Sequence, residues 1–233
     1  MMVRAALLAL SLLVTGTGAA FGQAAVELSG RTQQIPRNGY RTWSLFLICT
    51  PDWVTRDMSS DLANLYQRFQ AFGDAIGDEN LAVWFWKRDT PLDDPRLSDN
   101  VDVPRSAEYC RALRLRPSEG PFLVVTNAYP DLKAFPNERA VFALGGLKVV
   151  DLARLLNTLT DELLLEGKVE AARRAAAPPA AAGSPPAVTA TTSGLWIQLL
   201  EGARRSMIGF GCQVKMQIST GILSAELRGC AGG

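Results

Sequence analysis

The run Trp43-Ser44-Leu45-Phe46-Leu47-Ile48-Cys49 (WSLFLIC, residues 43–49) decides the expected fold, because it is a nearly continuous apolar segment of strand length. Arg41 precedes it and Thr50-Pro51-Asp52 follows it, so polar and turn-forming residues mark both ends. A strand that is apolar on both faces is typical of the centre of a sheet covered by helices on each side. We therefore predict a buried central strand at 43–49.

Strands and helices alternate after this run. Apolar residues recur at intervals of three and four between Leu62 and Ile76, which predicts an amphipathic helix that Gly77 ends. Three further strands are expected at 81–86, 121–126 and 139–144, with a short helix from Ser106 to Leu113 and a long helix from Leu147. The order predicts an α/β fold, a three-layer sandwich whose central mixed sheet is mostly parallel and is closed by an antiparallel pair.

From about Arg41 to Gly167, this order resembles the thioredoxin-like fold superfamily. The segment RLRPSEGPFLVV at 114–125 is similar to the family's short helix and loop, in which a cis-proline begins the next apolar strand. The resemblance implies that Pro121 is this cis-proline. Redox members carry Cys-x-x-Cys after the first core strand, whereas the stretch CTPDWVTR at 49–56 holds Cys49 alone. The resemblance therefore implies the fold without its dithiol, and Cys49 is the one candidate for a catalytic thiol.

The composition excludes several classes of function. The chain has 233 residues, of which 48% are hydrophobic, with a formal net charge of +1 and no histidine. Without histidine there is no Ser-His-Asp or Cys-His nucleophile system and no imidazole metal ligand. A balanced charge does not provide the basic face that a nucleic-acid-binding protein needs. We expect no cofactor, no metal site and no nucleic-acid partner.

Residues 1–24 have the three-part layout of a secretory signal peptide. Arg4 precedes the apolar run Ala5–Val14, and small residues lead to cleavage-like positions at Ala20 and Ala24. The alternative is a membrane anchor, but a spanning helix needs about 20 apolar residues. The sequence predicts export to the periplasm or beyond, with no transmembrane span after cleavage.

A change of composition divides the rest of the chain. Residues 168–193 are rich in Ala, Pro, Ser and Thr, and Pro178-Pro179 and Pro185-Pro186 favour extended chain. We interpret this stretch as a linker between a thioredoxin-like domain at 25–167 and a small segment at 194–233. The alternative is an ordered surface excursion of one domain.

The C-terminal segment is expected to hold a helix and a β-hairpin. Between Trp196 and Met207 the apolar residues share one helical face beside Arg204-Arg205, so this helix either docks on a partner or membrane surface or packs on its own protein. Alternating apolar residues between Cys212 and Cys230 predict the hairpin.

Four cysteines allow two structural disulfides in an exported protein. Cys212 and Cys230 lie at the two ends of the hairpin, which favours a bond that closes its base. Cys49 and Cys110 are left for a bridge inside the main domain, with free buried thiols as the alternative.

Candidate binding residues occupy two places. Asp52, Trp53 and Arg56 lie in the strand-to-helix turn, where this fold usually places function. Trp84 and Trp86 are two residues apart, so they share one side of a strand and either form the floor of a ligand groove or belong to the core.

Five aspartates lie in the loop from Asp89 to Asp102, which also contains arginines. Their spacing does not match a calcium loop, so we predict a solvated surface loop.

Together these features predict an exported, non-catalytic thioredoxin-like binding or scaffolding protein with a protein partner in the cell envelope. They predict no particular oligomeric state. The alternative is an exported thiol-disulfide oxidoreductase or thiol-reactive enzyme that uses Cys49.

Overall fold

The computed structural model describes residues 25–30, 33–54, 59–77, 80–89, 93–176, 202, 205, 215–220 and 224–228. The predicted signal peptide at 1–24 lies outside these residues, as do Cys212, Cys230 and most of the predicted linker.

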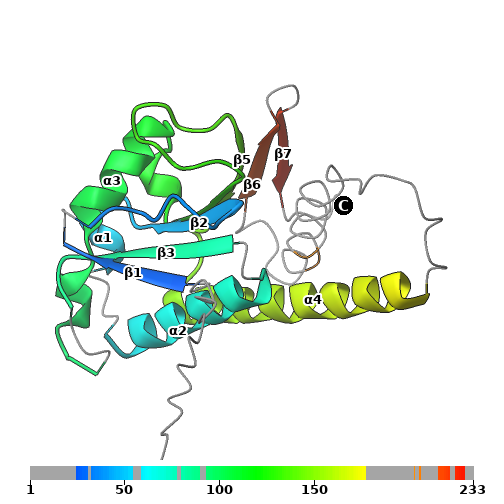
Figure 1. Ribbon diagram of the computed structural model, residues 1–233. Coiled ribbons are helices and arrows are strands. Elements are labelled where there is room, and N and C mark those ends of the chain that lie inside the picture. Colours follow the sequence, from blue (N-terminus) through cyan, green and yellow to red (C-terminus); the bar gives the residue numbers. More distant parts are fainter. Residues whose placement is uncertain are drawn as a thin grey trace, which may run out of the picture.

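One sheet with helices on both faces organises the described chain (Figure 1). The elements in chain order are β1 (Ala25–Ser29), β2 (Thr42–Leu47), α1 (Pro51–Val54), α2 (Ser59–Ala75), β3 (Asn80–Trp86), the 3-10 helix η1 (Leu97–Asn100), α3 (Val103–Ala112), the 3-10 helix η2 (Pro117–Glu119), β4 (Phe122–Thr126), β5 (Glu138–Ala143), α4 (Val149–Ala176), β6 (Lys215–Thr220) and β7 (Ser224–Arg228). The strands and helices predicted between 43 and 167 are confirmed. The sequence reasoning missed β1 and α1, although the alternation of Val26 and Leu28 with polar residues is a strand pattern.

The sheet is mixed, with the strand order β1-β3-β2-β4-β5-β6-β7. Among the described strands, β3 pairs in parallel with both β1 and β2, and the other four pairings are antiparallel. The prediction of a mostly parallel sheet is therefore wrong.

The direction of β4 follows from where α3 is held. A parallel strand needs a connection that carries the chain back to the other end of the sheet. Here the Asp102 N–H at the start of α3 donates to the Phe85 carbonyl, 3.1 Å away, at the end of β3. Near the other end of the helix, Cys110 is bonded to Cys49, just beyond β2. Both ends of α3 thus stay at the carboxyl ends of the strands, and β4 runs back antiparallel to β2.

Local hydrogen bonds set both ends of α3. The Asp102 carboxylate accepts from the Arg105 N–H at 3.1 Å, so Asp102 caps the helix. The predicted start at Ser106 is therefore four residues too late. At the other end the N–H groups of Arg114 and Leu115 donate back to the carbonyls of Arg111 and Cys110. Arg114 takes the left-handed conformation, with φ 56°, that this ending requires.

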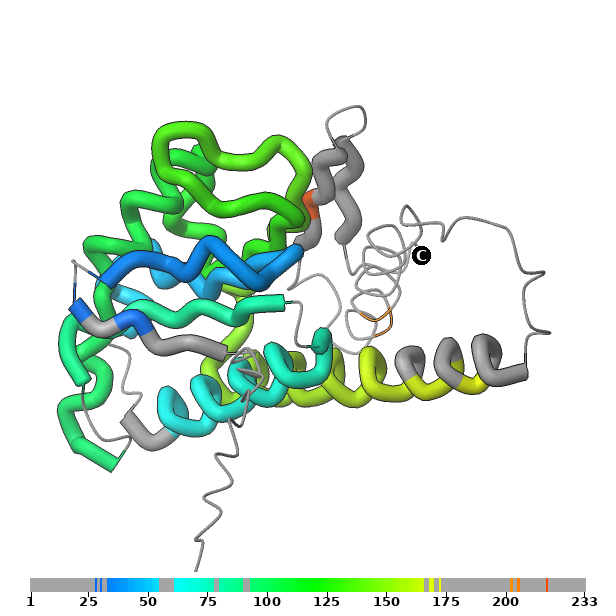
Figure 2. Tube along the Cα trace, in the orientation of Figure 1, coloured from blue at the N-terminus to red at the C-terminus, as the bar shows by residue number. Residues whose placement is uncertain are grey.

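The sheet separates two hydrophobic clusters. On one face α2 and α4 cover an aromatic group in which Phe46 stacks on Trp84 with ring centroids 4.8 Å apart, and Tyr66 contacts both Trp84 and Trp86 edge-on. On the other face α3 covers Leu45, Phe85 and their neighbours. Figure 2 shows α2 and α4 running side by side, with α3 across the sheet from them.

Trp84 and Trp86 are only 1% and 2% exposed. They lie in the core beneath α2, so they do not form the floor of a ligand groove. The groove interpretation is wrong because the helix that follows β2 covers this face of β3.

The C-terminal hairpin belongs to the main sheet. β6 pairs with β5, with Val141 opposite Gln217, and β7 pairs with β6. Arg205 forms an ion pair with Glu162 of α4 at 2.8 Å. These contacts agree with the prediction that the C-terminal segment packs on its own protein. They do not agree with a separate tail that a linker holds apart from the domain.

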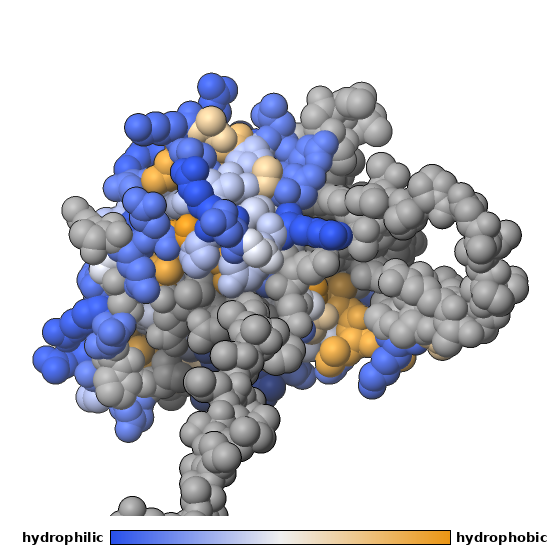
Figure 3. All heavy atoms as spheres, in the orientation of Figure 1, coloured by the Kyte–Doolittle hydropathy of each residue, from blue (hydrophilic) through white to orange (hydrophobic). Residues whose placement is uncertain are grey.

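The long helix α4 continues through Ala176 and so includes the start of the predicted linker. Leu164, Leu165 and Val169 are exposed on it, and Figure 3 shows a hydrophobic patch near the middle of the helix. No helix in the described ranges combines the length and the hydropathy that a membrane span needs.

The disulfide between Cys49 and Cys110 joins β2 to α3. Its two Cα atoms are 6.2 Å apart and it spans 61 residues of chain. Both cysteines are buried, at 8% and 2% exposure. A bridge with this span stabilises the folded state by about 4 kcal/mol in the chain-entropy account.

We expect the double variant Cys49→Ala/Cys110→Ala to unfold with a free energy lower by about 2–5 kcal/mol, because the unfolded chain regains the freedom that the bridge removes. Urea denaturation of the variant and the wild type under identical oxidising conditions measures the difference. Equal midpoints and equal slopes would contradict a structural role for this bond.

Gly145 closes the end of β5 against the turn before β4. Its N–H donates to the Glu119 carbonyl at 2.9 Å, and a Cβ at this position would lie 2.3 Å from the Gly120 carbonyl oxygen. The Gly120–Pro121 peptide bond beside it is cis. Only glycine lets the two backbones approach this closely.

We expect Gly145→Ala to lower the free energy of unfolding by about 3 kcal/mol, the upper end of the usual range for an overpacked site. The loss is large because the backbone itself must move to admit the methyl group. Thermal unfolding followed by circular dichroism tests this. Gly146→Ala at the exposed neighbouring position is the control, and a similar small loss in both variants would contradict the close approach.

Candidate functional site

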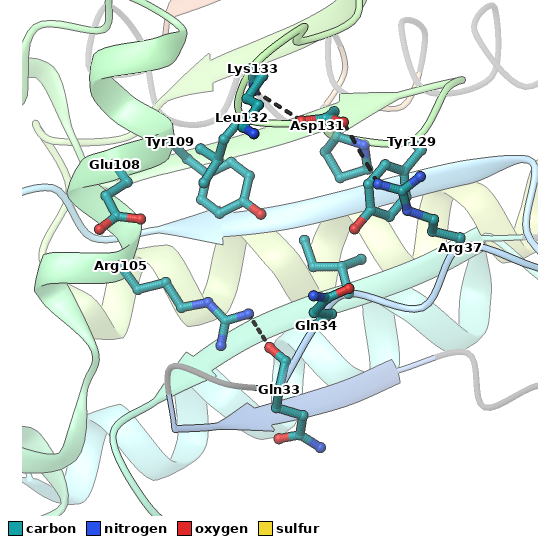
Figure 4. A pocket seen from close by; sticks show the side chains of 12 residues that line it. Gln33, Gln34, Arg37, Arg105, Glu108, Tyr109, Tyr129, Asp131, Leu132 and Lys133 are labelled. Atoms are coloured by element: carbon teal, nitrogen blue, oxygen red, sulfur yellow. Dashed lines mark hydrogen bonds and ion pairs between the residues drawn. The ribbon is translucent and has the colours of Figure 1, made fainter.

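A pocket of about 570 Å³ lies on the α3 side of the sheet (Figure 4). Three segments that are far apart in the chain form it: residues 33–37 between β1 and β2, the helix α3, and residues 129–133 in the loop from β4 to β5. A volume of this size is typical of small-molecule and peptide-residue sites.

Tyr109 of α3 lies in the wall of the pocket. Its ring stacks on Phe85 of β3 with centroids 5.3 Å apart, and Phe135 contacts it edge-on at 6.3 Å. The residue is only 5% exposed, and Figure 4 shows its hydroxyl directed into the pocket. No residue in the described part of the chain forms a hydrogen bond with this hydroxyl.

Burial raises the pKa of Tyr109 from 10.0 to about 12, and the positive charge of Arg105 opposes part of that rise. The phenol is therefore protonated at every pH near neutrality and is available as a hydrogen-bond donor.

Arg105, one turn before Tyr109, ties α3 to the segment before β2. Its Nη1 donates to the Gly30 carbonyl at 2.9 Å and its Nη2 donates to the Gln33 carbonyl. The guanidinium also lies 4.5 Å from the centroid of the Phe85 ring. Within the described residues Arg105 has no carboxylate partner, so its charge is balanced only by dipoles and a ring face.

An ion pair and a cation–π contact form the opposite wall. Arg37 Nη2 lies 3.7 Å from Asp131 Oδ2, and the Arg37 guanidinium lies 4.2 Å from the Tyr129 ring centroid. Trp43 contacts the same ring edge-on at 6.0 Å. These contacts hold Tyr129 so that its hydroxyl points into the pocket opposite Tyr109 (Figure 4).

The binding residues predicted at the turn after β2 do not form this site. Asp52 is exposed, whereas Trp53 is 7% exposed and packs into the core with α2 and α4. Trp53 is therefore unavailable to a partner. Arg56 lies outside the described residues.

Cys49 and Pro121 occupy neighbouring strand ends, because Leu47 pairs with Phe122 and the register continues past both. Cys49 is bonded to Cys110 and holds no free thiol. The structure thus places Cys49 and Pro121, two residues singled out by the resemblance, near each other, with the Cys49 sulfur in a disulfide.

The sequence reasoning missed the residues of the pocket. Arg37, Arg105, Tyr109 and Tyr129 belong to no motif, and 92 residues separate Arg37 from Tyr129. The one signal in the sequence was that Tyr109 directly precedes Cys110, which was predicted to form a disulfide.

Two aspartates of the loop from Asp89 to Asp102 accept hydrogen bonds from backbone N–H groups. Asp102 is buried as the cap of α3, and Asp94 accepts from the Arg96 N–H at 2.7 Å. Within the described ranges, no group of three or more acidic or cysteine side chains could hold a metal ion.

Comparison of the chain with known protein families, with curated proteins and with solved structures finds no match.

Because the pKa of Tyr109 is raised on folding, this residue lowers the free energy of unfolding at alkaline pH. Below pH 10 both states keep the proton; between about pH 10 and 12 the unfolded state releases it first, so stability falls with rising pH. We expect a loss of up to about 1.4 kcal/mol per pH unit from this group. Urea unfolding across this range, compared with Tyr109→Phe, measures it. A variant with the same pH slope as the wild type would contradict the assignment to Tyr109.

Proposed function

We propose that this chain is an exported, non-catalytic binding or scaffolding protein of the cell envelope with a thioredoxin-like fold. The order of strands and helices supports this fold, as does the short helix α3 that leads to Pro121 at the start of β4. The cluster β3-β2-β4-β5 with helices on both faces corresponds to the sandwich that the resemblance implies.

The disulfide between Cys49 and Cys110 is the observation that carries the non-catalytic part of the proposal. Redox members of the fold need a thiol pair at the turn after the first core strand, where the helix start favours a reactive thiolate. At this turn the chain has Asp52 where the second cysteine would stand. The only cysteine here points to the other face of the sheet and is buried against α3.

The pocket between α3 and the loop from β4 to β5 supports a binding role. One ion pair, a cation–π contact and ring contacts hold the side chains of its walls, and two tyrosine hydroxyls converge in it. A fixed, mixed polar and apolar pocket is suited to recognition of a ligand or a partner side chain. On this proposal the pocket is the recognition site, and the turn at Asp52 is only part of the scaffold.

Export is supported by the signal-like layout of residues 1–24 and by the disulfide. Disulfides persist outside the cytoplasm, where thiol reductants do not remove them. A main domain stabilised by such a bond is consistent with a periplasmic or secreted location.

We expect native protein to show no reactive thiol and to reduce insulin disulfides no faster than the uncatalysed reaction with dithiothreitol. The variant Cys49→Ala/Cys110→Ala is the matched control, and its rate should equal that of the wild type. If the wild type accelerates insulin reduction and this variant does not, the result favours the alternative, an oxidoreductase that uses Cys49.

A further inference from the structure

The pocket contains a hydroxyl that no described residue pairs with. Tyr109 is 5% exposed, its hydroxyl points into the pocket, and no described residue accepts from it. The one buried side-chain polar atom without a partner in the described chain is Asn80 Nδ2, so the Tyr109 hydroxyl is open to the pocket and can be reached from it. An acceptor on a bound ligand would satisfy this hydroxyl.

A second donor faces the same space. Tyr129 comes from the loop after β4, and the stacked Arg37 and the edge of Trp43 hold its ring. In Figure 4 its hydroxyl and that of Tyr109 point into the same part of the pocket. A ligand group with two acceptor atoms close together could accept a hydrogen bond from each of these hydroxyls.

The charge around these hydroxyls favours an anionic acceptor. Arg105 carries a positive charge that no carboxylate in the described chain neutralises. Asp131 is already engaged, because one oxygen faces Arg37 and the other accepts from the Lys133 N–H at 2.9 Å. Glu108 is exposed on α3 and also lines the pocket, so the lining carries two carboxylates, Glu108 and Asp131, against three cationic side chains, Arg37, Arg105 and Lys133. An anionic oxygen near Arg105 would form charge-assisted hydrogen bonds, which are stronger than neutral ones.

The rest of the pocket is suited to an apolar group. Ile35 is 3% exposed in its lining, Pro130 is buried, and Leu132 is 37% exposed at the rim. The volume of about 570 Å³ is far larger than a lone carboxylate requires. A ligand that fills it has an apolar body attached to its anionic group.

We propose that this pocket binds a carboxylate with an apolar body, with Tyr109 and Tyr129 as hydrogen-bond donors to the carboxylate and Arg105 as the neighbouring positive charge. The proposal rests on the binding function proposed above and names the class of ligand for it. A free organic acid and the C-terminal residue of a peptide both present this chemistry.

Calorimetric titration of the full chain tests the class of ligand with two matched probes. N-acetyl-leucine carries the carboxylate and N-acetyl-leucinamide replaces it with a neutral amide, while the apolar body is the same. We expect the acid to bind at least about tenfold more tightly than the amide, which corresponds to one hydrogen bond to a charged group. Equal affinities, or no binding of either probe, would overturn the proposal.

Two variants test the assigned donors. Tyr109→Phe removes one hydroxyl and keeps the stacked ring, and it should weaken binding of N-acetyl-leucine by about tenfold. Tyr129→Phe should have a similar effect and serves as the second variant if the first is poorly folded. Tyr66→Phe is the control, since that hydroxyl accepts from Gln70 Nε2 at 2.9 Å on the opposite face of the sheet. Unchanged affinity in both pocket variants contradicts the assignment.

The source of the carboxylate is resolved by two further probes. Tighter binding of hexanoate than of N-acetyl-Ala-Ala-Leu would support a free organic acid, and the reverse order would support a peptide C-terminus. These titrations test only the class of ligand. The proposal that the protein is non-catalytic is tested separately, by thiol reactivity and by insulin reduction.

Discussion

The attachment of α3 at both of its ends is the constraint on which the rest of the structure depends. The backbone bond from Asp102 to Phe85 and the disulfide from Cys110 to Cys49 keep this helix across the carboxyl ends of β2 and β3. The chain must then start β4 from that same end, which makes the sheet mixed. The same attachment lays Tyr109 on Phe85 and so creates one wall of the pocket.

The two faces of the sheet have different roles because their covers differ. On one face two long helices enclose an aromatic cluster in which Trp84 is almost fully buried. On the other face α3 is only ten residues long, so loops complete the cover. Arginines fix those loops: Arg105 bonds to backbone carbonyls before β2, and Arg37 pairs with Asp131. A pocket forms where loops replace a helix as the cover of a sheet.

Much of the fold could be predicted from the sequence, because strands such as 43–49 and helices such as α2 have strong periodic patterns. The direction of β4 could not, since it depends on where α3 is held and not on the pattern of either element. The pairing of β5 with β6 joins two segments that are far apart in the chain, Glu138–Ala143 and Lys215–Thr220, and no local pattern encodes that. The pocket was missed for a similar reason: Arg37, Tyr109 and Tyr129 are ordinary residues until the fold brings them together.

The antiparallel pairing of β5 with β6 has a consequence for the integrity of the chain. Without the last strands, β5 would present a row of unpaired N–H and C=O groups along an apolar, well-formed strand. Such an exposed edge is a template for another copy of the same strand, and proteins usually shield it. The C-terminal hairpin pairs this edge and moves the open edge of the sheet to β7, whose sequence SAELR carries two charged residues of the kind that disfavour edge pairing.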